Sequence, residues 1–337
     1  MKFEIPLKFE EEYIDFVNKN SDKIYSVYFP VFHLFPLTAR IANYPLNESL
    51  LKNVDKKIKR KLLLNGRFVS EHFYDKNFIK MLKEFIDEYQ IYCCIVTDGY
   101  FAKFLDDNDI PIQLSINFGL RKTKDFKFYK NYFKNLVNDF IIDRNMNLNP
   151  EIYDEIHAAT DCNFIMLANE GCLYNCPFKV SHDIVISYFN RQFYDPIFLL
   201  YNNLKELSEL HSQYSCVRVL KEKPWIILTS PFVRPEDLTK YPGNIIWKIA
   251  RREVETEVLK MICESYFKQK CIMNLLSLLD TGSFLENEYW LMSDKISKEY
   301  PEFHETRMYC DKDCAECGFC KKVFYNCSQK LMGGEDE

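Results

Sequence analysis

Residues 76–97, KNFIKMLKEFIDEYQIYCCIVT, contain one helix followed by one strand, and units of this kind decide the fold. The first part carries apolar residues at steps of three and four positions: Phe78, Met81, Leu82, Phe85 and Ile86. This spacing predicts an amphipathic helix over Lys76–Gln90. The run Tyr92–Thr97 is short and apolar, which is typical of a buried strand. The stretch therefore predicts a helix that packs on a parallel sheet.

The same alternation continues along the chain. Further strands are predicted at Ile24–Phe29, Lys61–Leu64, Ile112–Asn117, Asp139–Arg144, Asn163–Ala168, Pro224–Leu228 and Asn244–Lys248. Further helices are predicted at Tyr129–Asn138, Pro150–Ala159 and Val254–Lys268. Eight strands in alternation with helices predict an α/β fold, a (β/α)8 TIM-like barrel. A doubly wound sheet is the alternative, but no GxGxxG or GxxxxGK[ST] motif supports nucleotide binding.

Composition limits the class of protein. The chain has 337 residues, 47% of them hydrophobic, and its net charge of −5 gives no global attraction for a polyanion. No apolar window is long enough to cross a membrane, and residues 1–6 do not resemble a signal peptide. We therefore expect a cytoplasmic protein without membrane insertion. In that reducing compartment, 13 cysteines indicate metal or redox chemistry and not disulfides.

A first group of cysteines follows the strand predicted at Asn163–Ala168. Cys172 and Cys176 form a CxxxC pair, and Cys216 precedes the strand predicted at Pro224–Leu228. In a barrel both loops open at the C-terminal face, so the three thiols can converge. A 4Fe–4S cluster would need a fourth ligand. The alternative is that these cysteines are unliganded small apolar residues.

A second group lies in the tail, where residues 310–320 read CDKDCAECGFC. Its members are Cys310, Cys314, Cys317 and Cys320, with Cys327 seven residues later. Clustered thiolates repel each other unless a cation neutralises them, so the pattern predicts a metal site. Zinc, a second iron–sulfur cluster, or a missing ligand for the barrel site all fit this spacing. We expect residues 1–302 to form the barrel and the Cys-rich residues 303–337 to pack on or near its mouth.

Polar residues at the C-terminal ends of the predicted strands are candidates for binding and catalysis. They are Asn65, Asp98, Asn117, Arg144, Glu170, Arg234 and Lys248. Among them the charged residues Glu170, Arg144, Lys248, Asp98 and Arg234 are the catalytic candidates. The alternative is a structural role, in which Arg144 and Lys248 pair with Glu170 or Asp98. His182, close after Cys176, is expected to be a structural histidine, and the alternatives are a metal ligand or a proton donor.

Three segments resemble a known family. They are ANEGCLYNCP at 168–177, SPFVRPEDL at 230–238 and WKIARR at 247–252. Together they resemble the collagenase-like peptidase family U-32, which includes proteins of oxygen-independent ubiquinone and RNA hydroxylation. The resemblance extends from about residue 20 to the tail. It implies a barrel and a 4Fe–4S cluster held by four cysteines, of which Cys172, Cys176 and Cys216 match three. The barrel part offers no clean match for the fourth, so the tail cysteines are candidates.

The resemblance implies an enzyme of oxygen-independent oxidation or hydroxylation. Its substrate would be a quinone precursor, an RNA or a peptide, served by a partner protein or an electron donor. The basic stretches Lys56–Lys61 and Arg121–Lys130 are either contacts for an acidic partner or solvated faces. The alternative function is a non-catalytic accessory protein with a structural zinc or iron–sulfur site. A peptidase ranks third, because HExxH, GxSxG and a local Cys–His signature are absent.

Overall fold

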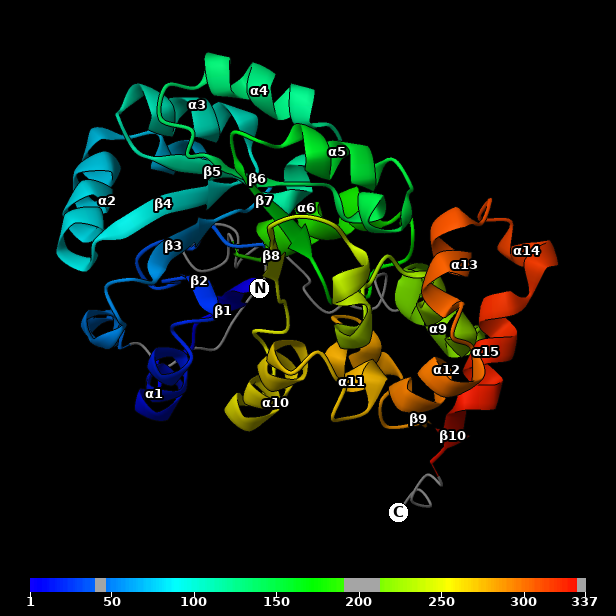
Figure 1. Ribbon diagram of the computed structural model, residues 1–337. Coiled ribbons are helices and arrows are strands. Elements are labelled where there is room, and N and C mark those ends of the chain that lie inside the picture. Colours follow the sequence, from blue (N-terminus) through cyan, green and yellow to red (C-terminus); the bar gives the residue numbers. More distant parts are fainter. Residues whose placement is uncertain (40–46, 191–212, 332–337) are drawn as a thin grey trace.

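The computed structural model describes residues 1–39, 47–190 and 213–331. Eight parallel strands form one sheet in the order β5-β4-β3-β2-β1-β8-β7-β6. The strands are β1 (Lys2–Pro6), β2 (Ile24–Phe29), β3 (Lys59–Leu64), β4 (Ile91–Val96), β5 (Ile112–Leu114), β6 (Asp139–Ile141), β7 (Asn163–Leu167) and β8 (Ile245–Lys248). This cyclic order, with helices around the strands, confirms the predicted (β/α)8 barrel (Figure 1).

The barrel is nearly closed at the seam between β5 and β6. Ile112 of β5 forms a single parallel bridge with Leu136, just before β6. Its amide donates to Asn135 O at 3.0 Å, and its carbonyl accepts from Val137 N at 2.9 Å. The seam is therefore joined at one point.

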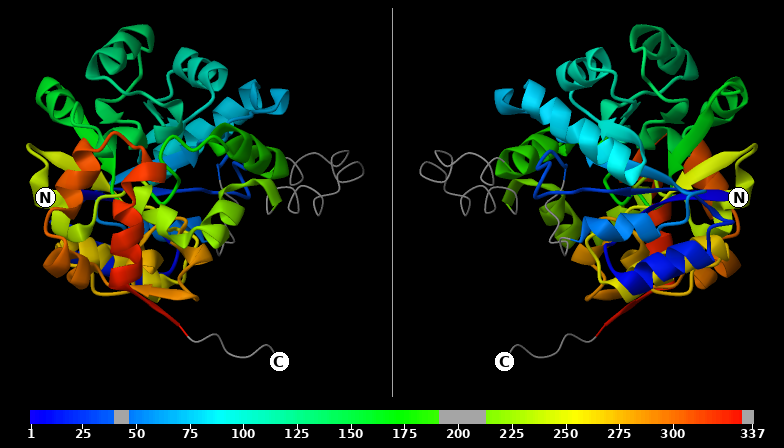
Figure 2. Two further views of the ribbon diagram at one scale, coloured as in Figure 1. Left: turned by 90° about the vertical axis from the view of Figure 1, so that its right-hand side faces the viewer. Right: turned by 90° about the vertical axis from the view of Figure 1, so that its left-hand side faces the viewer.

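The helices lie outside the strands. Around the barrel they are α1 (Glu11–Lys19), α2 (Lys76–Tyr89), α3 (Gly99–Asp107), α4 (Thr123–Tyr132), α5 (Ile152–Ala158), α6 (Lys179–Asn190), α9 (Cys216–Glu222) and α10 (Thr256–Phe267). Helix α1 lies beside α10, as the right view of Figure 2 shows. The short 3₁₀ helices are η1 (Glu48–Asn53), η2 (Glu71–Phe73), η3 (Ile116–Phe118), η4 (Arg144–Leu148), η6 (Pro224–Thr229), η7 (Pro235–Lys240) and η8 (Gly282–Phe284).

The α2–β4 unit shows how local sequence sets the elements. The Asp75 carboxylate caps α2 by accepting from the amides of Asn77 and Phe78. Gln90 ends the helix in the left-handed conformation, with φ of 53°. The buried face of α2 consists of Phe78, Ile79, Leu82, Phe85 and Tyr89. This face follows the spacing that predicted the helix.

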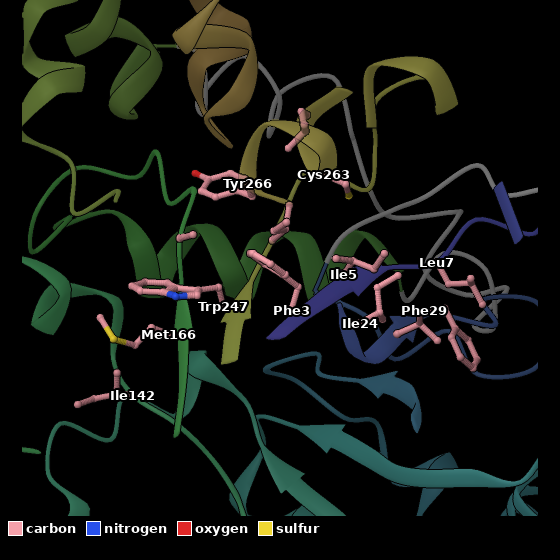
Figure 3. Close-up of a cluster of buried hydrophobic side chains, with 14 of the residues drawn as sticks. Phe3, Ile5, Leu7, Ile24, Phe29, Ile142, Met166, Trp247, Cys263 and Tyr266 are labelled. Atoms are coloured by element: carbon pink, nitrogen blue, oxygen red, sulfur yellow. The ribbon is translucent and has the colours of Figure 1, made fainter. Parts of the chain in front are cut away.

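Two separate cores result from the alternation of side chains along each strand. The larger core lies between the strands and the outer helices. In Figure 3, Phe3 of β1 and Trp247 of β8 lie toward Tyr266 of α10. Among the described residues, two small apolar clusters lie inside the barrel, Tyr28–Leu63–Ile95 and Ile141–Ile165–Ile246.

Charged residues occupy the rest of the barrel interior, and we call them the central ion cluster: Glu4, Lys61, Asp139 and Lys248. Lys61 Nζ lies 2.5 Å from Glu4 Oε2 and 2.7 Å from Asp139 Oδ2, and all three side chains are fully buried. Lys248 pairs with the other oxygen of Glu4. Two lysines and two carboxylates balance each other, as burial of charge requires.

The structure corrects some sequence predictions. The strand predicted at Pro224–Leu228 is wrong, because Pro224–Thr229 is the 3₁₀ helix η6, with Pro224 in its first turn. The eighth strand is β1, which was not predicted. The helix predicted at Tyr129–Asn138 lies earlier, at Thr123–Tyr132.

The chain after β8 forms a helical region at one side of the barrel (Figure 1). It contains α11 (Leu275–Leu278), α12 (Ser293–Glu299), α13 (Phe303–Tyr309), α14 (Cys314–Cys317) and α15 (Phe319–Cys327). Strands β9 (Tyr289–Leu291) and β10 (Ser328–Lys330) pair antiparallel and fasten the end of the tail. No helix in the described ranges is long and apolar enough to cross a membrane.

Candidate functional site

A cavity of about 140 Å³ opens at the C-terminal ends of the strands, and we call it the mouth cavity. Strand residues such as Tyr28, Leu63 and Ile141 form its floor. Residues at or just after the strand ends form its wall, among them Asn65, Asn117, Arg144, Glu170 and Lys248. Five of the seven polar candidates at predicted strand ends therefore line one cavity.

Cys172, Cys176 and Cys216 also line the mouth cavity. Cys172 and Cys176 lie in the loop between β7 and α6, whereas Cys216 begins α9. Burial raises the pKa of Cys216 to about 11, and the neighbouring Cys176 adds to the shift. Burial, followed by the Glu170 carboxylate, raises the pKa of Cys172 well above its ordinary value. The fold thus brings together the three thiols that the sequence predicted would converge.

The buried ion pair of Arg144 and Glu170 stands beside these thiols. Arg144 Nη1 lies 2.7 Å from Glu170 Oε2. The other Glu170 oxygen accepts from the Cys172 amide at 2.8 Å. Arg144 also donates to the Asn117 side chain. Glu170 therefore fixes the cysteine loop, and the structural pairing considered for Arg144 and Glu170 is present.

A second charged group lies on the α6 side of the cavity. Asp183 pairs with Lys179 and, at 3.2 Å, with Arg67 Nε. Burial alone would raise the pKa of Asp183, but Lys179 and Arg144 outweigh it, so the net shift is downward. His182 lines the same cavity. This wall combines basic side chains with an imidazole.

Lys248 connects the mouth cavity to the central ion cluster. It pairs with Glu4, and its Nζ lies 3.4 Å from the centre of the Tyr28 ring. Burial lowers the pKa of Lys248 to about 8, although the Glu4 carboxylate opposes the shift. The partner of Lys248 is Glu4 and not Asp98 or Glu170. Lys248 is thus both a cavity residue and part of an ion pair.

The backbone around Gly171 is packed tightly against the segment that follows α11. The Gly171 carbonyl accepts from Ser230 Oγ at 2.9 Å and from the Thr281 hydroxyl. A Cβ atom at Gly171 would lie only 2.5 Å from Thr281 N. Glycine is therefore required here, and the contact positions Cys172 next to it.

Two catalytic candidates lie outside the mouth cavity. Asp98 caps α3, where its carboxylate accepts from the Phe101 amide at 2.9 Å. Arg234 is buried and forms a two-bond pair with Asp237, at 2.7 and 3.1 Å. Arg234 was placed at the mouth because Pro224–Leu228 was predicted to be a strand, and that prediction is wrong. Both residues have structural partners.

The tail cysteines line a separate small cavity of about 30 Å³, which we call the tail cavity. Four of the five cysteines reach it, namely Cys310, Cys314, Cys317 and Cys320. Cys327 is fully buried in the larger apolar core instead. The structure therefore divides the five tail cysteines into a group of four and a core residue.

In the described parts of the chain, no three His, Cys, Asp or Glu side chains already stand at the spacing of a metal coordination sphere. The donor set of the mouth cavity nevertheless fits a cluster with three thiolate ligands. Arg144, Lys179, Lys248 and Arg252 line the same cavity and can offset thiolate charge. Among the described residues that line this cavity there is no fourth thiol, and His182 and several carboxylates are the other side chains of types that bind iron.

Several residues of the site were not predicted from the sequence. Lys179 and Asp183 lie four residues apart directly after the CxxxC pair, and this i,i+4 spacing is a signal that could have identified them. Glu4 was missed together with β1. A signal for this strand was available, because the charged Glu4 stands between the apolar residues Phe3 and Ile5, as alternation along a strand requires.

The fold and site define a parallel α/β barrel with a cysteine-lined mouth cavity. Over 183 residues the chain is 31% identical to the uncharacterized protease MJ1657 of Methanocaldococcus jannaschii. The match covers 54% of this chain and 51% of that protein, so the chain spans about half the length of the curated relative it matches. The solved structure of the U32 peptidase Mk0906 is also similar, with a TM-score of 0.48 and 12% identity over 76% of this chain and 95% of that one. No family model matches the chain. Both of these proteins are described as peptidases, which is also the description of the family that the three motif segments resemble.

Proposed function

We propose that the chain is an enzyme that holds an iron–sulfur cluster through Cys172, Cys176 and Cys216 and acts on a substrate in the mouth cavity. The observation that carries the proposal is the meeting of these three thiols in one cavity at the C-terminal face of the barrel. Parallel α/β barrels place their chemistry at this face. Reduced thiolate ligands also fit the reducing cytoplasm.

The reaction that fits best is oxidation or hydroxylation without O₂. The cluster supplies one-electron transfer when it is bound. Hydroxylation of a C–H bond with the oxygen of water releases two electrons and two protons. Such a reaction requires an electron acceptor, which is the role we assign to a partner protein. A quinone precursor, an RNA or a peptide remains the proposed class of substrate.

The polar residues of the mouth cavity would bind and orient this substrate. Asn65 and Asn117 present amide groups to the cavity, and Arg144 presents a guanidinium already paired with Glu170. Lys248 Nζ, with its pKa lowered to about 8, can exchange a proton near neutral pH. Glu4 behind Lys248 holds the amine in place.

A peptidase is a second candidate, because the sequence relative is described as a protease. In a peptidase, the polar residues of the mouth cavity would surround a peptide bond of the substrate, and not a carbon atom that is to be oxidised. A non-catalytic accessory protein is the third candidate. The tail cavity supports it, because four thiols lie there apart from the mouth cavity.

The deciding experiment measures iron, acid-labile sulfide and zinc in protein purified without oxygen, together with its visible spectrum. We expect about four irons and four sulfides per chain, the content of one 4Fe–4S cluster. Replacing Cys172, Cys176 and Cys216 together with serine should abolish them. Cys162→Ser is the matched control, because Cys162 is half-buried and lines neither cavity described above.

Folded protein that lacks iron, even after anaerobic reconstitution, would contradict the proposal. Peptide hydrolysis that survives the triple serine variant but not Lys248→Met would favour the peptidase. Zinc without iron, and no activity of either kind, would favour the accessory protein.

A further inference from the structure

The strongest unexplained feature outside the mouth cavity is the tail cavity. Its four cysteines come from three consecutive elements. Cys310 follows α13, Cys314 and Cys317 lie one turn apart on α14, and Cys320 lies in the first turn of α15. Gly318, with φ of 64°, reverses the chain between α14 and α15. This turn brings Cys320 back toward the other three.

The four thiols line one cavity together with Arg307 and Lys312. Two of these thiols use backbone carbonyls as acceptors. Cys310 Sγ lies 3.5 Å from Arg307 O, and Cys320 Sγ lies 3.8 Å from Leu228 O. Both are weak hydrogen bonds.

A second observation points independently to an anionic site. Arg307 lines the tail cavity and is only 2% exposed, yet no ion pair to a carboxylate is found for it within the described residues. Its guanidinium donates to the carbonyls of Ser230 and Phe232, while its Nε has no hydrogen-bond partner. The guanidinium lies over the Phe232 and Phe303 rings, 4.1 and 4.8 Å from their centres. The carboxylate that acts on it, Asp237, is already paired with Arg234. Neither contact gives Arg307 a counter-charge of its own, and a buried charge without one is costly. Thiolates in the tail cavity would provide the counter-charge.

A divalent ion would offset two of the four thiolate charges. Two basic residues of the cavity, Arg307 and Lys312, also offset negative charge, and Lys312 Nζ lies 3.2 Å from Cys310 Sγ. Four cysteine thiolates around one ion are also the closed ligand set of structural zinc sites.

We propose that Cys310, Cys314, Cys317 and Cys320 bind a single structural zinc ion in the tail cavity, separate from the mouth cavity. Cys327 is not a ligand, because it is packed in the apolar core. A closed site of four cysteines leaves no position for substrate, so this metal stabilises structure. It would fasten α13, α14 and α15 beside η6, on which α15 packs. The proposal does not rest on the proposed function.

The experiment measures zinc and iron in the full-length protein and in three variants. We expect one zinc per chain in the wild type and almost none in the double variant Cys314→Ser/Cys317→Ser. Cys327→Ala is the matched control and should retain zinc. The triple serine variant of Cys172, Cys176 and Cys216 should lose iron but retain zinc. This result would separate the tail proposal from the mouth proposal.

A cobalt titration tests the site without any substitution. Wild-type protein stripped of zinc should bind one Co²⁺, with the strong visible absorption and thiolate charge-transfer band of a tetrahedral thiolate site, and zinc should displace it. Absence of both zinc and this cobalt spectrum would overturn the proposal. So would zinc that persists in the double tail variant, or iron and sulfide that persist in the triple mouth variant.

Discussion

The mouth cavity and the tail cavity gather cysteines in different ways. At the mouth, Cys172 and Cys176 meet Cys216 only because the barrel brings the loop after β7 to α9. In the tail, four cysteines lie within residues 310–320 and need little more than local turns to converge. Their surroundings differ too. The Arg144–Glu170 pair beside the mouth thiols is complete without metal, whereas Arg307 beside the tail thiols has no carboxylate partner among the described residues.

This difference implies different relations between metal and folding. The mouth site is assembled from distant segments, so it can form only once the barrel has folded. The stability of the barrel then depends largely on its own ion pairs and apolar core, and little on the metal. A site assembled within a short segment can order that segment as it binds metal. The following predictions test whether residues of this chain hold the mouth cavity in place before any metal binds. They run from the largest expected effect to the smallest.

Breaking the mouth ion pair should have the largest effect. Arg144→Met leaves the buried Glu170 carboxylate without its partner, which we expect to lower the free energy of unfolding by about 3–5 kcal/mol. Urea denaturation of metal-free protein measures this change. Arg121→Met is the control, since Arg121 is more than half exposed and lies 3.9 Å from Asp143. Its effect should stay below about 1 kcal/mol. Equal losses in the two variants would show that the mouth is not preorganised by this pair.

The central ion cluster should make stability depend on pH in acid. Burial alone would raise the pKa of Glu4, but Lys248 and Lys61 lower it to about 2 from an ordinary value of 4.5. The folded state therefore binds the proton more weakly than the unfolded state. The stabilisation, about 3 kcal/mol, is complete above pH 4.5 and is lost as the pH falls toward 2.

Comparison with a variant isolates this contribution. The wild type should be more stable than Glu4→Gln at pH 6, and the difference should shrink as the pH falls from 4.5 to 2. Denaturant unfolding across this range measures it. Glu11→Gln on the exposed side of α1 is the control, and its effect on the free energy of unfolding should be small. A difference for Glu4→Gln that stays constant with pH would contradict the role assigned to the cluster.

The sequence predicts the outer architecture better than the interior. Apolar runs identified β2 at its observed bounds, because a strand buried on both faces is marked by its own residues. Strand β1 was missed because it is short and contains Glu4 and Pro6. Residues 224–228 look like a strand but form η6, since their apolar side chains pack against α9 and α15 outside the barrel.

The candidate site divides in the same way. Cys172 and Cys176 were predictable from strand order, because they follow β7. Cys216 was placed beside them through the strand predicted at Pro224–Leu228, which is wrong, and it reaches the mouth cavity from the start of α9. The pairing of Lys248 with Glu4 was not, since the two residues lie 244 positions apart and only the closed order of β8 and β1 joins them. Arg234 was misplaced because its position depended on the wrong strand.

A clash beside Cys172 should disturb the mouth but not the tail. Gly171→Ala places a Cβ atom 2.5 Å from Thr281 N, so the loop has to shift. We expect a loss of about 1–3 kcal/mol and less bound iron per chain, with zinc unchanged. Gly99→Ala is the control, because no atom lies within 4 Å of the added Cβ. It should be neutral or stabilise α3 by about 0.5–1 kcal/mol. Normal iron content in Gly171→Ala would show that the cysteine loop does not depend on this contact.

The smallest expected effect concerns Ser230, which lies between the two cavities. Its hydroxyl donates to Gly171 O beside Cys172, and its carbonyl accepts from Arg307 beside the tail cavity. Ser230→Ala removes only the hydroxyl, and Thr281 still donates to Gly171 O. We therefore expect a loss of about 0.5–1.5 kcal/mol in the free energy of unfolding. Ser70→Ala should cost nothing, because the buried Ser70 hydroxyl has no hydrogen-bond partner among the described residues.

Metal analysis of Ser230→Ala then tells whether the two cavities are independent. If each is held by its own partners, iron and zinc should both remain at wild-type levels, because the Arg307 contact uses the Ser230 backbone, which the substitution leaves in place. A fall in zinc would mean that the Gly171–Ser230 bond transmits a displacement from the mouth to Arg307. In that case the two groups of cysteines would act as one coupled unit, and the contrast between them would be limited to how each is assembled.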